Sequence, residues 1–312
     1  MKYKASKAAL GQWKTEYKVL LVVLVILIGL VLWGMAFGNR LEALLYKPLK
    51  TPEEWCKMQP CITIPFFETS IIIVKPTSSF IVFFLGFQTI AIGIFLMIQG
   101  KREKSHLWWG VALILWGLGA LFAGMSYQAF SFMLKCSGRS FCVWTSWWEI
   151  IYLIFSVGSV DAMLISQAYS CVLPKNRKIL LAFGLVSFTV YFSVVLIGAF
   201  IPIRFLISFE LMVVFLIPNI LFFLGLNLRR YRKNQNPMDK NLLLIWISLI
   251  VIIGLYFLYL ILGITAYLWE YGIWFSENDI LHIGLIIWMF FILYTVKNHV
   301  VDLNRVNSDN QI

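Results

Sequence analysis

The sequence predicts an all-α polytopic membrane bundle of about eight transmembrane helices, and three observations lead to this fold class. First, 61% of the 312 residues are hydrophobic and only 13% are charged, whereas soluble domains average roughly 45–50% apolar and about 25% charged residues. Second, the apolar residues form runs of about 20, the length that crosses a bilayer. Third, most Lys and Arg residues lie in the segments between these runs, on one side of the predicted membrane. This composition excludes a soluble enzyme, a disordered chain and a coiled coil.

Eight apolar runs predict the eight spans. They cover residues 19–37, 77–99, 107–134, 145–172, 179–200, 205–227, 242–266 and 280–296. The first run exceeds the apolar core of about 7–15 residues found in cleavable signal peptides, so we expect it to be retained as an anchor. The chain is then divided into an N-terminus with its anchor helix, a seven-helix membrane domain and a short tail, at residues 1–40, 41–300 and 301–312.

The basic residues predict the orientation of the helices. Eighteen of the Lys and Arg residues fall on one side of the predicted spans and seven on the other. By the positive-inside rule, the richer side is cytoplasmic, so we expect both termini in the cytoplasm. A plasma membrane and a secretory-pathway membrane both fit this multi-pass arrangement. Anionic lipid headgroups are the natural counter-charge for the net charge of +11, and no nucleic-acid partner is expected.

Four of the five cysteines fall in the two loops expected on the non-cytoplasmic side. Cys56 and Cys61 lie in the first loop and Cys136 and Cys142 in the second, whereas Cys171 lies near the cytoplasmic end of a span. Because that side is oxidising, the four cysteines predict one or two disulfides. Their spacing leaves the connectivity open.

Three polar residues that are far apart in the sequence share one level near the non-cytoplasmic ends of their spans: Ser126, Glu149 and His282. Ionisable groups at membrane depth are costly and usually face a cavity or a partner. Glu149 lies in an apolar run and therefore needs a cation, a metal or a hydrogen-bond donor. Either Glu149 and His282 hold a metal or a water together, or Glu149 makes a structural hydrogen bond at a helix end.

Two further acids fall within predicted spans. For Asp161 and Glu210 we expect interhelical hydrogen bonds, with proton relay in a small-solute transporter as the weaker alternative. The transporter hypothesis predicts an internal repeat, and none is visible in the sequence. Gly117-Leu118-Gly119 predicts a close contact between helices.

Four short motifs, in order and at one membrane level, resemble those of the alkaline ceramidases, which belong with the adiponectin-type receptors to a group of seven-helix membrane hydrolases. The motifs are Glu54-Trp55-Cys56-Lys57 followed by Glu68, Gly124-Met125-Ser126, Trp148-Glu149 with Ser156, and Asn278-Asp279-Ile280-Leu281-His282. The resemblance covers roughly residues 50–300. It leaves the first span as an addition to a seven-helix core.

The resemblance implies a lipid-binding intramembrane cavity and hydrolysis of a ceramide-like lipid amide by water activated at zinc. It implies Ser126, Glu149 and His282 as catalytic residues, with ceramide or another long-chain membrane lipid as the partner. The implied zinc ligands are His282, Glu149 and Asp279. The implied calcium ligands are Glu54, Trp55, Gln59 and Glu68.

This chain departs from the family pattern at positions that matter for metal binding. Phe130 and Asn278 stand where the family has two of its three histidines, and Lys57 stands where it has an acid. The alternative hypothesis is therefore a non-catalytic lipid-binding or receptor-like protein that kept the fold after losing zinc.

Overall fold

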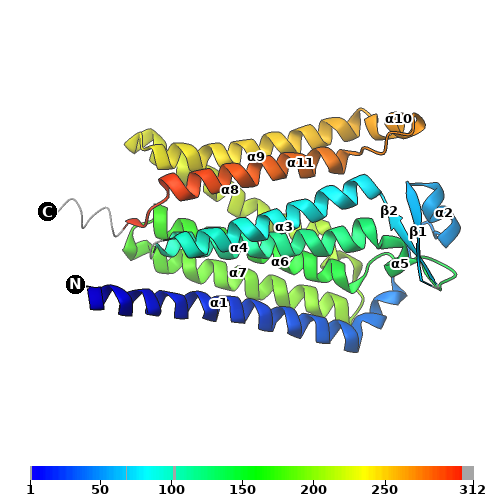
Figure 1. Ribbon diagram of the computed structural model, residues 1–312, viewed down its shortest axis with the longest axis horizontal. Coiled ribbons are helices and arrows are strands. Elements are labelled where there is room, and N and C mark those ends of the chain that lie inside the picture. Colours follow the sequence, from blue (N-terminus) through cyan, green and yellow to red (C-terminus); the bar gives the residue numbers. More distant parts are fainter. Residues whose placement is uncertain (1, 68, 101–102, 304–312) are drawn as a thin grey trace.

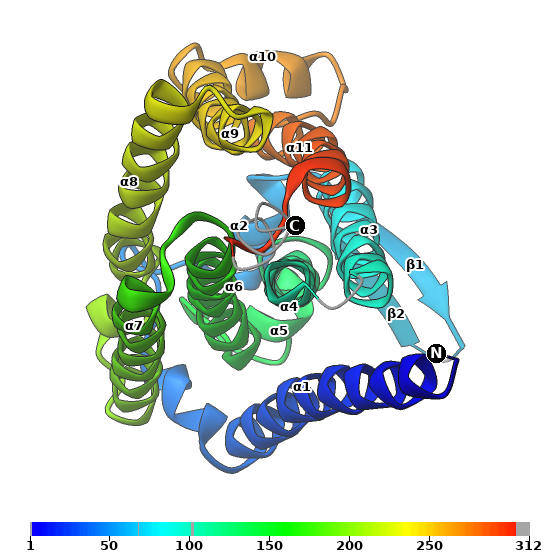
Figure 2. The same cartoon turned by 90° about the vertical axis from the view of Figure 1, so that its left-hand side faces the viewer.

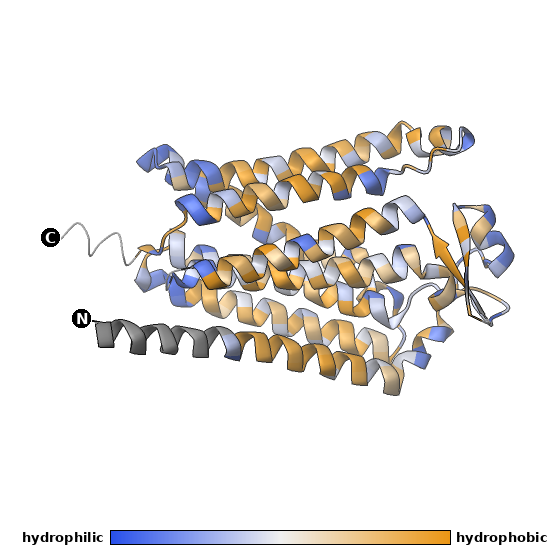
Figure 3. Ribbon diagram, viewed as in Figure 1, coloured by the Kyte–Doolittle hydropathy of each residue, from blue (hydrophilic) through white to orange (hydrophobic). Residues whose placement is uncertain are grey.

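The computed structural model describes residues 2–67, 69–100 and 103–303. Within them, eight helices are long and apolar enough to cross a membrane, and hydrophobic residues cover the middle of the bundle (Figure 3). The chain is thus an all-α, multi-pass integral membrane protein, as its composition predicts. The spanning helices are α1 (Lys2–Phe37), α3 (Pro76–Gln99), α4 (Lys104–Ala123), α6 (Trp147–Cys171), α7 (Pro174–Phe200), α8 (Phe209–Asn234), α9 (Pro237–Ile261) and α11 (Glu277–His299).

The two ends of the bundle differ in structure (Figure 1). At one end, here called the termini end, α1 begins and α11 finishes. The other end carries both disulfides, Cys56–Cys61 and Cys136–Cys142, and is here called the disulfide end. These pairs settle the connectivity that spacing left open. The short elements of this end include α2 (Pro52–Lys57), an antiparallel hairpin of β1 (Cys61–Phe66) and β2 (Thr69–Val74), α5 (Ser131–Lys135) and α10 (Ile264–Glu270).

Two predicted spans are interrupted near the disulfide end. The third is not one continuous α-helix, because α4 gives way to a π-helical turn, η2 (Gly124–Ala129), before α5 begins. Such turns change the direction of neighbouring side chains and often occur at functional sites. The seventh predicted span stops at α9, since Gly263 adopts a left-handed backbone conformation with φ of 63° before α10. Glycine tolerates this conformation and commonly ends helices.

Helix α6 is the most buried of the spanning helices in the described chain, and it packs against α4, α7 and α8 (Figure 2). Polar contacts join α6 to α8 within the bundle. The Asn219 amide donates to Asp161 at 3.1 Å, and the Asn227 amide donates to Gln167 at 3.0 Å. The interhelical hydrogen bond predicted for Asp161 is confirmed, whereas Glu210 is exposed in the first turn of α8.

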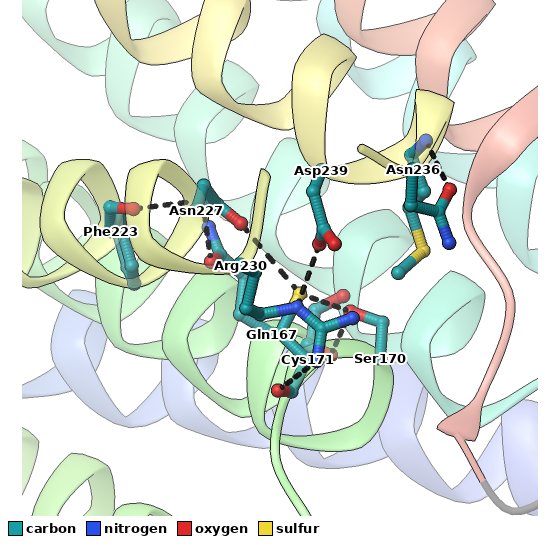
Figure 4. Close-up of polar contacts among 10 residues, drawn as sticks. Gln167, Ser170, Cys171, Phe223, Asn227, Arg230, Asn236 and Asp239 are labelled. Atoms are coloured by element: carbon teal, nitrogen blue, oxygen red, sulfur yellow. Dashed lines mark hydrogen bonds and ion pairs between the residues drawn. The ribbon is translucent and has the colours of Figure 1, made fainter. Parts of the chain in front are cut away.

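A second polar cluster joins α6, α8 and α9 at the termini end (Figure 4). The Arg230 guanidinium lies 2.7 Å from a carboxylate oxygen of Asp239 and donates to the carbonyl of Cys171, also at 2.7 Å. The side chain of Asp239 is fully buried. Because the guanidinium supplies both its charge and directed N–H groups, it fixes three helix ends to one another.

Glycines bring α3 and α4 into backbone contact. A Cβ added at Gly93 would lie 2.7 Å from the carbonyl oxygen of Gly110, and one added at Gly117 would lie 2.7 Å from that of Gly86. The close contact predicted for Gly117 is confirmed. Small residues at such crossings allow helices to pack without large side chains between them.

Helix α1 lies along the outside of the bundle (Figure 2), and almost none of its apolar span is buried. Its main described anchor is Trp147 at the start of α6, whose indole N–H donates to the carbonyl of Leu30 at 2.7 Å. Gly34 makes room for the ring, because a Cβ there would overlap the indole. This contact, together with the ring contacts of Trp33 and Phe37 with Phe200 on α7, holds an otherwise lipid-facing helix against the bundle.

We expect Gly34→Leu to displace α1 from Trp147 and to cost about 1–3 kcal/mol, as other overpacking substitutions do. The matched control is Gly29→Leu, because no atom lies within 4 Å of a Cβ at Gly29. The measurement is the thermal unfolding midpoint of both variants in the same lipid nanodiscs. Equal midpoints would contradict the anchoring contact.

Candidate functional site

Ser126, the predicted hydroxyl of the site, lies in the π-helical turn η2 and is fully buried. Its hydroxyl donates to the carbonyl of Phe122 at 2.8 Å, one turn earlier in the same helix. Serines in membrane helices commonly make this local bond. In the structure, therefore, the described hydrogen bond of Ser126 is with its own helix.

Glu149 lies in the first turn of α6 and is 3% exposed. One carboxylate oxygen accepts a hydrogen bond from the Thr145 hydroxyl at 2.9 Å, and the other forms an ion pair with the ammonium of Lys135 on α5. The sequence predicts that this acid needs a cation, a metal or a donor. A cation and a donor are both present.

His282 and Asp279 lie on α11. The Nδ1 atom of His282 is buried and has no hydrogen-bond partner in the described chain. Asp279 accepts from the backbone N–H of Ser276 at 2.6 Å and from its hydroxyl at 3.0 Å, forming a capping box at the start of α11. Asp279 thus stabilises a helix end.

The structure does not join the three predicted catalytic side chains. Among the described residues, no hydrogen bond or ion pair links Ser126, Glu149 and His282. Nor does the described chain contain a group of three or more His, Cys, Asp or Glu residues placed to hold a metal ion. Zinc binding stays a prediction from the resemblance.

Of the residues expected to bind calcium, Glu54 and Trp55 lie in α2 and Gln59 lies just after it. Glu54 accepts from the backbone N–H of Thr51 at 2.8 Å as part of a capping box. Trp55 is buried and Gln59 is half-buried, and both line a cavity described below. Glu68 lies outside the described residues. Calcium binding likewise stays a prediction.

A cavity of about 240 Å³ opens at the disulfide end, and Lys135, the ion-pair partner of Glu149, forms part of its wall. The walls come from the segment before α2, from α2 and the residues just after it, from the residue before α3, from η2 and from α5. They combine aromatic rings with cationic side chains. The lining residues are Tyr46, Lys50, Trp55, Met58, Gln59, Lys75, Tyr127 and Lys135.

Lys135 is held between the Glu149 carboxylate and aromatic rings. Its ammonium lies 4.9 Å from the ring centroid of Tyr127 and 6.0 Å from those of both Tyr46 and Trp55. These distances are within the range of cation–π attraction. Burial lowers the pKa of Lys135, but the negative charge of Glu149 and the neighbouring Tyr46 raise it by more, so the pKa lies above its ordinary value. Lys135 is therefore charged at neutral pH.

The other two lysines of the cavity form no ion pair within the described chain. The Lys50 ammonium lies 5.0 Å from the ring centroid of Tyr46. Lys75 precedes α3 with φ of 46°, a left-handed conformation that is uncommon for lysine and frequent at functional sites. Burial lowers the pKa of Lys75, while the negative charges of Glu277 and Asp279 oppose this effect.

Sequence reasoning missed these lysines, although one signal could have found them. The positive-inside bias leaves few cations near the disulfide end, and three of them, Lys50, Lys75 and Lys135, line the same cavity. Cations on the side where the bias disfavours them need an explanation other than topology. Their convergence identifies the cavity as the candidate site.

Comparison with known proteins adds no family to this geometry. The chain matches no family model, no curated protein and no solved structure. The resemblance to alkaline ceramidases therefore depends on the four short motifs alone, and the candidate site must be judged from its own residues.

Proposed function

We propose that this integral membrane protein is a non-catalytic, receptor-like protein that binds the headgroup of an amphipathic lipid in the cavity at the disulfide end. One observation carries the proposal. Glu149, the acid that lipid hydrolysis would need, is committed on both oxygens, to Lys135 and to Thr145. A general base or a metal ligand must point its carboxylate toward the reacting water or the ion, and here each oxygen is already oriented toward Lys135 or Thr145. The arrangement supports binding without catalysis.

The size and position of the cavity support a headgroup as its occupant. Small-molecule sites usually measure about 300–1,000 Å³, and this cavity of about 240 Å³ holds less than a whole lipid. Large apolar side chains are exposed at or next to its lining residues, among them Leu49 and Met58. Such side chains suit the membrane interface. The charge bias of the chain supports an orientation in which this end faces away from the cytoplasm.

Binding and hydrolysis are separated by one experiment on protein in phosphatidylcholine nanodiscs. We expect no release of fatty acid from a short-chain ceramide above that of the Ser126→Ala variant, in which the lost hydroxyl donates to Phe122 of the preceding helical turn. Ceramide turnover that falls by orders of magnitude in Ser126→Ala would overturn the proposal in favour of a hydrolase.

Binding itself is measured by the shift that single-chain amphiphiles cause in the unfolding midpoint. Gln59→Trp should fill the cavity and abolish the shift, because the Gln59 side chain forms part of its wall. Glu53→Trp is the matched control, since Glu53 is exposed on the same segment and lies outside the cavity lining. Equal shifts in both variants would argue against this cavity as the binding site.

A further inference from the structure

The charges of the cavity do not balance. Lys135 has its counter-charge in Glu149, but Lys50 has no ion-pair partner among the described residues, and neither has Lys75. Two ammonium groups that face a partly enclosed space keep an electrostatic demand for a negative charge.

The acids nearest to Lys75 are engaged elsewhere. Glu277 accepts a hydrogen bond from the Thr265 hydroxyl at 2.5 Å, and Asp279 accepts from the backbone and hydroxyl of Ser276. Both acids act on Lys75 through space, as the opposing effects on its pKa show, but neither forms an ion pair with it in the described chain. The positive charge of Lys75 is therefore partly balanced by nearby acids, whereas that of Lys50 has no such counter-charge among the described residues.

The aromatic rings of the cavity do not make it a site for a cationic headgroup. Rings of this kind attract quaternary ammonium ions when their faces are free. Here the ammonium of Lys135 already lies over Tyr127, and that of Lys50 lies near Tyr46. A second cation would meet like charges at the same faces. Gln59 adds a neutral hydrogen-bond donor to the wall.

We infer that the cavity binds an anionic group, a carboxylate or a phosphate, between the ammonium groups of Lys50 and Lys75. This inference rests on the proposed function, because it names the chemistry of the headgroup that occupies the cavity. Charge-assisted hydrogen bonds from the two lysines supply most of the recognition. Lys135 lines the same cavity, but its charge is already balanced by Glu149.

The test compares amphiphiles of equal chain length on the same nanodisc protein: dodecanoate, dodecyl phosphate and dodecanol. We expect both anions to bind at least tenfold more tightly than dodecanol. Lys50→Gln and Lys75→Gln should each weaken the binding of both anions about tenfold, the effect of losing one charge-assisted hydrogen bond. The affinity for dodecanol should stay unchanged. Lys75→Arg, which keeps the charge, should retain binding.

The matched controls are Lys47→Gln and Lys57→Gln, since both lysines lie in the segment between α1 and β1, as Lys50 does, but outside the cavity lining. If the control variants weaken anion binding as much as the cavity variants do, the inference is overturned. Equal affinities for dodecanol and the anions would overturn it as well, and would leave a binding cavity without charge preference and the proposed function intact.

Two further outcomes separate the sources of the anion. If acetate and inorganic phosphate bind as tightly as the amphiphiles, with the same loss in Lys50→Gln, the anion site stands and the ligand is a free solute, which contradicts a lipid headgroup. If neither anion nor dodecanol binds, and Gln59→Trp changes nothing, the proposed function and the inference both fail.

Discussion

Glu149→Gln is expected to destabilise the folded protein by about 3–5 kcal/mol, because it leaves the ammonium of Lys135 buried without a counter-charge. Lys135 is 2% exposed, so water cannot replace the lost carboxylate. The rings of Tyr46, Trp55 and Tyr127 already contact this ammonium in the wild type, so they do not replace the lost carboxylate. The measurement is the free energy of unfolding in denaturant, for protein in a fixed lipid or detergent.

The double variant Lys135→Met with Glu149→Gln should recover most of this loss, because it removes both buried charges together. The control is the exposed pair Arg139 and Glu42, which are 2.6 Å apart with side chains 30% and 54% exposed. Breaking that pair should cost less than about 1 kcal/mol. If the double variant loses as much free energy of unfolding as the two single variants together, the buried ion pair does not stabilise this part of the bundle.

Gly110→Leu is expected to produce the second large effect, a loss of about 3 kcal/mol or failure to assemble. A Cβ at Gly110 would lie 2.7 Å from the carbonyl oxygen of Gly93 and would overlap the side chain of Met97. Backbone atoms cannot swing aside as a flexible side chain can, so α3 and α4 would have to separate. The measurement is the unfolding midpoint together with the yield of monodisperse protein.

The matched control for this crossing is Gly254→Leu on α9, where no atom lies within 4 Å of an added Cβ. It introduces the same side chain into a spanning helix at a position open to lipid. We expect its midpoint to match that of the wild type. A similar loss in both variants would show that leucine disturbs the helices without any role for the close approach of α3 and α4.

The fold was largely predictable from the sequence because the bilayer imposes a simple length rule on apolar runs. All eight runs correspond to spanning helices. What the rule cannot foresee is local backbone geometry. Residues 107–134 form one predicted span, yet α4 ends at Ala123 and a π-helical turn follows. Hydropathy carries no signal for such a turn.

The candidate site was predictable only in part. The burial of Glu149 in an apolar run correctly demands a counter-charge or a donor, but the sequence does not say which. Lys135 satisfies that demand from a short helix that follows the π-helical turn, and it arrives there through three-dimensional packing. Tyr46 and Lys50 reach the same cavity from a loop far away along the chain. The spacing of residues along one sequence does not show that these separate segments meet in space.

The peripheral helix α1 determines at which end of the bundle the following segment lies. This helix contributes little to the packed interior, yet it starts at the termini end and delivers the chain to the disulfide end. A polypeptide that began at α3 would cross the bilayer an odd number of times and would keep only Tyr127 and Lys135 of the residues that line the cavity. Helix α1 therefore matters mainly for the path of the chain, because it brings the segment with Tyr46 and Lys50 to the end of the bundle where the cavity lies.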